Sequence, residues 1–588
     1  MSERTDIAIC GGGLAGLTLA LQVKRRLPER RVTVFEPTRR PLPEACHKVG
    51  ESSVEVGAHY FGAVLGLHDY MMERHLPKNG LRFFSGVPGA PIEARAEMGP
   101  REAPRVPAYQ IDRGRFENDL RAWCVDAGVD LREGWGVRDV TLGEGAHMVS
   151  AVPVRGPREG EGAAAQREAR RVVDASGRRR LLAKKLGLQA DLPAQSSSAW
   201  FRVSERVKVR ELAGAAEGAW HERDVDDNRW LSTNHLCGTG YWVWLIPLGS
   251  GYTSVGIVAE ESVHPYKGFS TEAAAREWLA SHEPALAERL SGLDFADFIA
   301  MKGYRHGAKQ VFGERWALVG EAGIFVDPLY SPGSDMIGLG NSLTTELIAA
   351  DLAGEDLEPR RAHYDAFFRD WAALLARTLC EGSRAMGRPE VLGAKLYWDY
   401  FYYWACMCPY FLRGHYREPL ASHARFHDAL RAFAALNDQA QRVFQAWIDV
   451  APAEPGTAFV GLPAIATTLS DLHLALLEER DADETHAEMQ RSLAQGRELV
   501  DELWLRAVRR AGPTRAAALV ERIGWRPSPS DARLAADEAE PKRRRKLLSK
   551  PVRDMERSIG KNARAPGAPS LRELCASAPR VEAVSQSR

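Results

Sequence analysis

Three glycines near the N-terminus have the spacing of a dinucleotide-binding turn. Gly11, Gly13 and Gly16 form a G-x-G-x-x-G pattern directly after the apolar run DIAIC at residues 6–10. In such a turn a side chain would block the tight bend, the approach of a pyrophosphate, or the packing of the next helix on the strand. That helix would offer its free N–H groups and partial positive charge to the phosphates. The pattern therefore predicts a dinucleotide site.

An acidic residue follows at the distance that such a site needs. Glu36 lies 20 residues after Gly16, at the end of a second apolar strand, RVTVF at residues 31–35. Its carboxylate can accept hydrogen bonds from both hydroxyls of a ribose, which disfavours a 2′-phosphate. A lone G-x-G-x-x-G is a weak signal, and a glycine-rich turn without a ligand is the alternative. The strand, the helix and Glu36 favour a bound dinucleotide, but they do not separate FAD from NAD.

Three later segments are typical of one group of flavoproteins. YQIDRGRF at residues 109–116 contains a D-R-x-x-F pattern, DASGRRR at residues 174–180 ends an apolar strand, and ALVGEAGIFVDP occupies residues 317–328. These segments resemble those of the flavoprotein monooxygenase superfamily, in which the last one holds the ribityl chain of the flavin; Glu321 replaces the usual Asp there. The resemblance implies FAD as the cofactor. It also implies these further contacts to it: Arg113, Gly320, Glu321 and Asp327.

A more specific pattern is spread over three other regions. YWVWLIP at residues 241–247 contains W-x-W-x-I-P, and FVDPLYSPG at residues 325–333 contains F-x-x-P-x-x-S-x-G. VGESSVE at residues 49–55 is followed by PKNGLRFF at residues 77–84, which carries Lys78. These features resemble the flavin-dependent halogenases, the relatives of tryptophan halogenase. A packed strand, a Pro- and Gly-punctuated loop and a solvated lysine are the alternative interpretations of the separate motifs.

The resemblance implies an activity. Reduced FAD, oxygen and chloride or bromide would give hypohalous acid, which would travel to Lys78 and be directed onto an electron-rich ring. The lysine would form a haloamine or hold the hypohalous acid by a hydrogen bond, and burial would favour its reactive neutral form. The implied catalytic residues are Lys78, Tyr330 and Ser331. The implied halide and tunnel residues are Trp242, Trp244, Phe325, Pro328, Gly333 and Ser334.

Two positions depart from the tryptophan halogenases. Those enzymes carry Glu immediately before the loop serine, where this chain has Tyr330, so a free tryptophan substrate is disfavoured. They hold chloride with backbone N–H groups after that serine, and here Pro332 has no N–H. Gly333 and Ser334 would then supply the amides in a shifted turn. We therefore expect a phenol, a pyrrole or a carrier-bound aromatic as the substrate.

The elements that would position these residues belong to an α/β fold. Strands at residues 6–10, 31–35, 170–174 and 316–319 predict a Rossmann-like FAD-binding domain with a parallel sheet. Alternating segments between them predict an interleaved antiparallel substrate sheet, and a C-terminal helical region follows. The expected domains are a discontinuous FAD-binding domain at 1–345 with the inserted sheet at about 75–110 and 190–305, a helical cap at 346–524 and a charged, mobile tail at 525–588.

Composition narrows the class of protein. Lys plus Arg and Asp plus Glu both number 78, so no net charge attracts nucleic acid or an anionic membrane. The eight cysteines lack the spacing of a metal site, which favours a reduced, cytoplasmic protein without metal. No leader pattern and no apolar stretch of about 20 residues is present, so we expect no membrane span. We interpret the aromatic stretch at 396–411 as part of a helix core, and the wall of a substrate pocket is the alternative.

Partners and alternatives follow from what the motifs leave open. No second G-x-G-x-x-G follows a strand, so a separate NAD(P)H flavin reductase is expected to supply reduced flavin. The alternative enzyme is a flavin-dependent monooxygenase, hydroxylase or oxidase on the same scaffold, which product mass would distinguish. The alternative outside enzymes is a flavin-binding regulatory protein that uses the basic run PKRRRKLLSK at residues 541–550. Such a run is usually solvated, and we expect no nucleic-acid partner.

Overall fold

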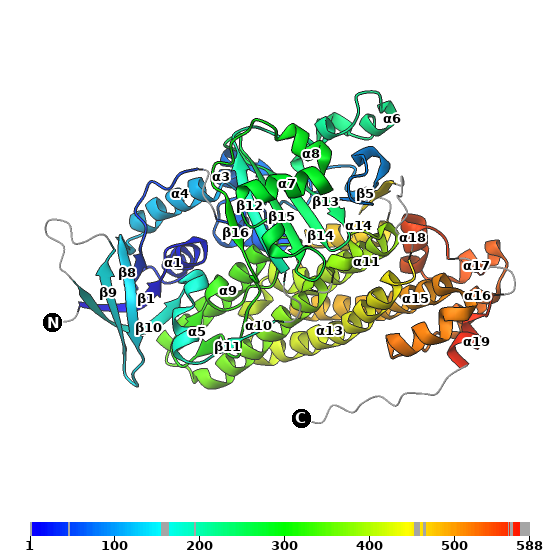
Figure 1. Cartoon of the computed structure of the whole chain (residues 1–588). Coiled ribbons are helices and arrows are strands. Elements are labelled where there is room, and N and C mark those ends of the chain that lie inside the picture. The colour runs from blue at the N-terminus through cyan, green and yellow to red at the C-terminus, as the bar shows by residue number, and fades with distance from the viewer. Residues whose placement is uncertain are drawn as a thin grey trace.

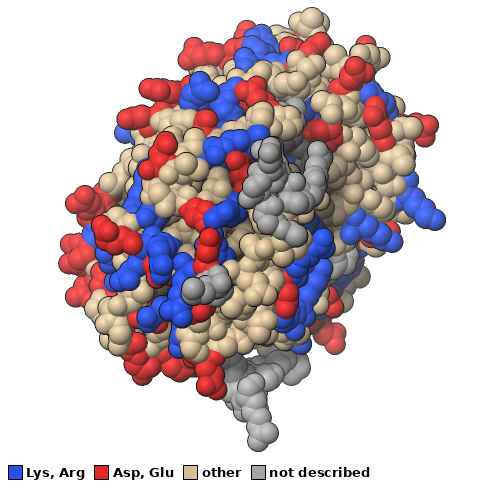
Figure 2. Space-filling model, turned by 90° about the vertical axis from the view of Figure 1, so that its left-hand side faces the viewer, with Lys and Arg blue, Asp and Glu red and all other residues tan. Residues whose placement is uncertain are grey.

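The chain folds into two sheets and a long set of C-terminal helices (Figure 1). The computed structural model describes residues 3–44, 48–154, 164–192, 196–380, 382–451, 459–462, 466–562, 564 and 568–576. Basic and acidic side chains are interspersed over the end of the molecule that carries the N-terminal sheet (Figure 2). Among the described residues, no helix is long and apolar enough to cross a membrane.

The N-terminal sheet is built on parallel strands. β1 (Glu3–Cys10) pairs in parallel with β2 (Val32–Glu36) and with β10 (Ala165–Asp174). Parallel neighbours need a crossover connection, and α1 (Leu14–Arg26) provides it between β1 and β2. The strand order is β18-β19-β10-β1-β2-β7. The other members are β7 (Asp130–Glu133), β8 (Trp135–Thr141), β9 (His147–Pro153), β18 (Phe312–Gly313) and β19 (Trp316–Leu318). The predicted parallel sheet is confirmed.

The second sheet is largely antiparallel and has the order β16-β12-β15-β14-β13-β4-β5-β20. Its strands are β4 (Leu81–Ser85), β5 (Ala96–Gly99), β12 (Ser196–Val203), β13 (Thr233–Gly238), β14 (Tyr241–Pro247), β15 (Thr253–Glu260), β16 (Ile299–Met301) and β20 (Phe459–Gly461). Every residue of β14 is buried, because both faces of the sheet are covered. Alternate residues point to opposite faces, so Trp242 and Trp244 join the main core while Val243 joins a second core.

The C-terminal helices pack against both sheets. In Figure 1, α9 and α10 run beneath them, and α13 runs alongside α15. The bounds are α9 (Pro332–Leu352), α10 (Leu357–Cys380), α11 (Pro389–Tyr402), α13 (Leu420–Ile448), α14 (Thr467–Ala475) and α15 (Ala482–Ile523). Gly512 has a φ of 72° and breaks α15 before Pro513. The C-terminal helical region that was predicted is present.

The expected mobile tail differs from the structure. Among the described residues, four helices follow α15: α16 (Asp531–Glu538), α17 (Pro541–Leu547), α18 (Lys550–Ile559) and α19 (Leu571–Ala576). Part of the charge in this region is paired, since Arg544 contacts Glu556 and Arg533 contacts Glu502. Lys542, Arg543, Arg545 and Lys546 are exposed, as the sequence suggests. The apolar face of α18 is buried through Val552 and Met555. The last twelve positions, 577–588, lie outside the described residues.

One buried carboxylate joins α18 to α14. The carboxylate of Asp554 accepts hydrogen bonds from the Thr467 hydroxyl (2.8 Å), the Thr468 N–H (2.9 Å) and the Thr468 hydroxyl (2.6 Å). It thus satisfies donors at the start of α14, which has no capping side chain of its own.

Asp554→Ala is expected to lower the free energy of unfolding by about 2 kcal/mol, because it leaves a buried helix start without its acceptor. Urea unfolding followed by circular dichroism measures this loss. Asp471→Ala is the matched control, because the ion pair of Asp471 with Lys550 connects the same two helices. That ion pair is exposed, so its loss should cost no more than about 1 kcal/mol. Equal losses in the two variants would contradict the buried cap.

Candidate active site

A cavity of about 710 Å³ lies at the carboxyl ends of the parallel strands. Its lining includes Cys10 at the end of β1, Glu36 at the end of β2, and Ala175 after β10. Ligands of open parallel sheets bind in this place, outside the carboxyl ends of the strands. The cavity is named here the dinucleotide cavity.

The glycines of the first turn fit a dinucleotide. A Cβ on Gly11, whose φ is +122°, would lie 2.2 Å from the carbonyl oxygen of Ala175. A Cβ on Gly16 would lie 2.0 Å from the carbonyl oxygen of Gly11. Gly13 also lines the cavity, and nothing in the described chain lies within 4 Å of its Cβ position. Two glycines therefore serve close backbone packing, and Gly13 leaves room for a ligand.

Polar groups around this cavity suit a flavin dinucleotide. Glu36, Arg113, Gly320 and Glu321 all line it. Glu36 accepts the N–H of Gly12 at 2.8 Å, which fixes its carboxylate beside the glycine turn. The Nε of Arg113 is buried and has no hydrogen-bond partner among the described groups, so a donor remains for a ligand. Burial raises the pKa of Glu321, against the charge of Arg178.

Asp327, which the sequence predicts as a cofactor contact, does not line the dinucleotide cavity but lines a smaller cavity next to it. Its carboxylate accepts hydrogen bonds from the Tyr304 hydroxyl at 2.8 Å and from Nε of Arg305 at 3.0 Å. All three residues are buried, and the guanidinium of Arg305 needs a counter-charge there. Asp327 therefore holds the loop before α9 in place.

A second cavity of about 100 Å³ adjoins the first. Trp244, Phe325 and Pro328 line both cavities, whereas Trp242 lines only the second. The two indoles stand side by side on β14, with ring centroids 5.7 Å apart. His235, which the sequence motifs did not identify, also lines this cavity; it stacks on Phe83, and burial lowers its pKa to about 3. We call this space the passage.

The start of α9 borders the passage. Tyr330 and Ser331 have φ values of 64° and 62°, so two residues in the left-handed region turn the chain before Pro332 opens the helix. Ser331, Gly333 and Ser334 line the passage. Amide N–H groups in the first turn of a helix have no intrahelical acceptor and carry partial positive charge. The structure therefore brings the predicted halide residues to the passage.

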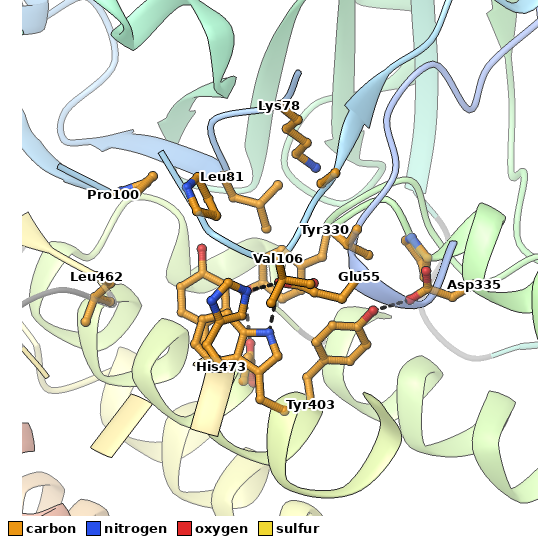
Figure 3. Close-up of a pocket in the computed structure, with 18 of the residues that line it drawn as sticks. Glu55, Lys78, Leu81, Pro100, Val106, Tyr330, Asp335, Tyr403, Leu462 and His473 are labelled. Atoms are coloured by element: carbon orange, nitrogen blue, oxygen red, sulfur yellow. Dashed lines mark hydrogen bonds and ion pairs between the residues drawn. The ribbon is translucent and has the colours of Figure 1, made fainter. Parts of the chain in front are cut away.

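Lys78 lies in a third cavity, of about 80 Å³, which we call the lysine cavity (Figure 3). Pro332 lines both this cavity and the passage. The lysine is 4% exposed, and its Nζ donates a hydrogen bond to the carbonyl of Ser53 at 2.8 Å. Burial lowers the pKa of Lys78 to about 7, although the charges of Glu55 and Asp335 oppose the shift. The amine is thus largely neutral in mildly alkaline solution.

Two carboxylates lie opposite this amine (Figure 3). Glu55, the first residue of α2 (Glu55–His59), accepts hydrogen bonds from Trp404 at 3.0 Å and from His473 at 3.1 Å. Burial alone would raise the pKa of Glu55, but the hydrogen bond and charge of His473 outweigh it and hold that pKa below its usual value. Asp335 accepts the Tyr403 hydroxyl at 2.6 Å and the Gly57 N–H at 2.8 Å. Burial raises the pKa of Asp335 to about 7.

Tyr330 contributes to the wall of the lysine cavity. Its hydroxyl donates to Asp399 at 2.9 Å, and Lys395 donates to the same carboxylate at 2.7 Å. Burial and the charge of Asp399 raise the pKa of Tyr330, so the phenol stays neutral. The aromatic stretch of α11 and the following π-helix η10 (Tyr403–Met407) is divided: Trp398 lies in the core, while Tyr402 and Tyr403 line the cavity.

Several residues of the lysine cavity had no signal in the sequence. Glu55 ends one quoted motif and Asp335 lies two residues after another, but neither was identified, because the sequence does not show that they face Lys78. Asp399 and His473 come from the helical region, far along the chain, and only the fold brings them here. The described residues contain no cluster of His, Cys, Asp and Glu that could hold a metal ion.

Comparisons with known proteins identify a family model, curated relatives and solved structures that are similar to this chain. The family model described as tryptophan halogenase matches residues 92–365. The flavin-dependent halogenase chlA of Dictyostelium discoideum is 28% identical over 445 residues, covering 71% of this chain and 72% of that protein. The 1H-pyrrole-2-carbonyl-(peptidyl-carrier protein) chlorinase of Pseudomonas fluorescens is 26% identical, covering 62% of this chain and 80% of that protein. The structure of the halogenase PltM with phloroglucinol and FAD shares the fold, with a TM-score of 0.62, 17% identity and coverage of 82% of this chain and 96% of that one.

Proposed function

The chain belongs to the flavin-dependent halogenase family, and from this premise we propose that it transfers chlorine or bromine to an electron-rich ring held beside Lys78. Members of this family use FAD with chloride or bromide. FAD in its reduced form supplies, with oxygen, the oxidising power that turns halide into hypohalous acid. The residues of the dinucleotide cavity that would hold it are Gly11, Gly13, Glu36, Arg113, Gly320 and Glu321, and Gly16 permits the tight turn behind them.

The passage lies between the dinucleotide cavity, where the oxidant would form, and the lysine cavity, where the halogen would be transferred. In the first turn of α9, the N–H groups of Gly333 and Ser334 would bind a halide. Pro332 has no N–H, so the first available donor is one residue further along the helix. Trp242 and Trp244 fill the sheet side of the passage. In the proposed reaction these indoles leave a route for a molecule as small as hypohalous acid and keep a ring away from the flavin.

The observation that carries the proposal is the burial of Lys78 at the end of this route. An amine in water is an ammonium at neutral pH and has no lone pair, whereas burial of Lys78 brings its pKa to about 7. With its lone pair available, the Nζ atom accepts halogen or hydrogen-bonds hypohalous acid. In either case it holds the electrophile against the aromatic wall of the lysine cavity.

The substrate and partners follow from the relatives and from the cavity. The named relatives include halogenases of carrier-bound pyrrole, and PltM binds phloroglucinol. We propose a phenol, a pyrrole or a carrier-bound aromatic for this chain, in secondary metabolism. Within the described residues a single parallel dinucleotide sheet is present, which supports a separate NAD(P)H flavin reductase as the source of reduced flavin.

The test begins with anaerobic reduction of the FAD-loaded protein, followed by oxygen, bromide or chloride and a panel of phenols and pyrroles. Mass spectrometry is expected to show a bromine or chlorine isotope pattern that requires the halide. A product that gains oxygen without halide would instead identify a monooxygenase on this scaffold. Addition of phloroglucinol to the panel compares the chain directly with PltM.

A further inference from the structure

The lysine cavity has an acidic side that the halogenation chemistry described above does not use. Three carboxylates line it, those of Glu55, Asp335 and Asp399, and none of the described lining residues is an arginine. A substrate carboxylate would therefore meet charges of its own sign without a guanidinium to bind it. A ring that donates an O–H or N–H group would instead find acceptors.

The three carboxylates differ in what they still offer. Asp399 accepts from Tyr330, Lys395 and Gln441, so protein donors surround it. Glu55 is paired with His473, which keeps its pKa low and makes it a weak base. Asp335 accepts one neutral donor on each oxygen, so a lone pair remains on each.

The position of Asp335 also suits a role in the reaction. It lies in the first turn of α9 and lines the lysine cavity, three residues after Pro332, which lines both that cavity and the passage. Its titratable neighbours are Lys78, Glu55 from α2, Tyr403 from η10, and Cys408, which directly follows η10. Burial raises the pKa of Asp335 to about 7, within reach of a catalytic base at neutral pH.

We propose that Asp335 accepts the O–H or N–H proton of the substrate ring, so that the lysine cavity prefers phenols and similar acidic donors to their O-methylated counterparts. This inference rests on the proposed function and names the substrate class of the same site. Loss of the proton places negative charge on the ring atom, which makes the ring carbons at the ortho and para positions stronger nucleophiles.

The transfer balances in atoms and electrons. The ring provides the electron pair of the new carbon–halogen bond, and the nitrogen or oxygen that carried the halogen keeps the pair of the broken bond. Asp335 holds the hydroxyl proton while the halogen arrives. The ring carbon then loses its own proton to that nitrogen or oxygen, and Asp335 returns the hydroxyl proton. The ring is oxidised and the halogen is reduced by two electrons.

The first experiment measures binding to the flavin-free protein. Calorimetry with phenol and anisole is expected to show that the wild type binds phenol at least about tenfold more tightly, because only phenol donates to a charged acceptor. In Asp335→Asn, which keeps the side-chain shape, the preference should fall to within about threefold. Glu55→Gln is the matched control and should retain the preference. A preference that survives Asp335→Asn, or is absent from the wild type, overturns the proposal.

The second experiment measures halogenation. Asp335→Asn should lower the rate with phenol at least about thirtyfold. Its rate with anisole, which has no hydroxyl proton, should stay within about threefold of the wild-type rate. Equal losses with both rings would show a structural role and overturn the proposal. A wild type that halogenates no ring at all would overturn the proposed function, and the binding preference would still decide the role of Asp335.

Tyr403→Phe tests the role of Asp335 through the pH dependence of phenol halogenation, which a purely structural role of Asp335 would leave unchanged. Its hydroxyl stabilises the charged form of Asp335, so its loss should raise the pKa of that carboxyl further. The pH midpoint for phenol halogenation should then move upward by at least about half a unit, while the anisole profile stays in place. A midpoint that is the same in both proteins counts against Asp335 as the proton acceptor.

Discussion

Lys78→Ala is expected to reduce the rate of halogenated product at least about a hundredfold while FAD binding is unchanged. The side chain lies in the lysine cavity and not in the dinucleotide cavity, so its loss removes the group that holds the electrophile and leaves the flavin contacts intact. The measurement is a single turnover with reduced FAD, oxygen and bromide, read by mass spectrometry, together with an FAD titration.

Lys78→Arg tests whether the reaction needs a neutral amine or only a positive charge at this position. Arginine stays protonated throughout the working range, so this variant should be as inactive as the alanine variant. Lys309→Ala, at an exposed lysine, controls for the loss of a charge. In the wild type the rate should rise as pH passes about 7, because the ammonium of Lys78 predominates below that value and the free amine above it. Halogenation by Lys78→Ala at the wild-type rate would remove Lys78 from the mechanism.

Gly16→Ala is expected to lower the free energy of unfolding by about 3 kcal/mol and to abolish FAD binding. Helix propensity alone would favour alanine at this position in α1 by about 1 kcal/mol. The steric effect is larger, because the new Cβ would lie 2.0 Å from the backbone oxygen of Gly11, which cannot move without displacing the turn. Thermal and urea unfolding without FAD measure the loss of stability.

Gly13→Ala is the matched variant in the same turn. No described protein atom lies within 4 Å of its Cβ position, so the flavin-free protein should keep its stability. FAD binding should weaken at least about tenfold, since the methyl group enters the space left for the ligand. The thermal shift on adding FAD reports the affinity. If both alanine variants lose the same stability without FAD, the division of roles between the two glycines is wrong.

The features that could be predicted from the sequence are local or periodic. The β1-α1-β2 unit is contiguous, and its glycine spacing is a local signature that can be recognised without knowing that the carbonyl of Ala175 packs against Gly11. Trp242 and Trp244 share a face because the side-chain period of a strand is two. Lys78 was identified by resemblance alone, since a lysine followed by Asn and Gly indicates no burial.

The features that could not be predicted depend on residues distant in the chain. His473 reaches Glu55 across 418 positions, and no spacing rule connects them. The charges of residues 531–559 suggested solvent, but their partners include Glu502 on α15. Asp327 sits inside a cofactor motif, yet the buried guanidinium of Arg305 binds its carboxylate. In each case the partner decides the role, and the partner is set by tertiary structure.

The close contact between α2 and α9 predicts that positions 57 and 334 change together among homologues. A Cβ on Gly57 would lie 2.2 Å from the Oγ of Ser334 and 2.5 Å from its Cβ, and Gly57 donates its N–H to Asp335. A larger residue at position 57 would therefore need glycine at position 334. Otherwise it would displace the start of α9 and move the carboxylate of Asp335 away from the amine of Lys78. Homologues that keep this chamber should show paired substitutions at the two sites, and lineages in which the pair drifts independently should have changed the rings that they modify.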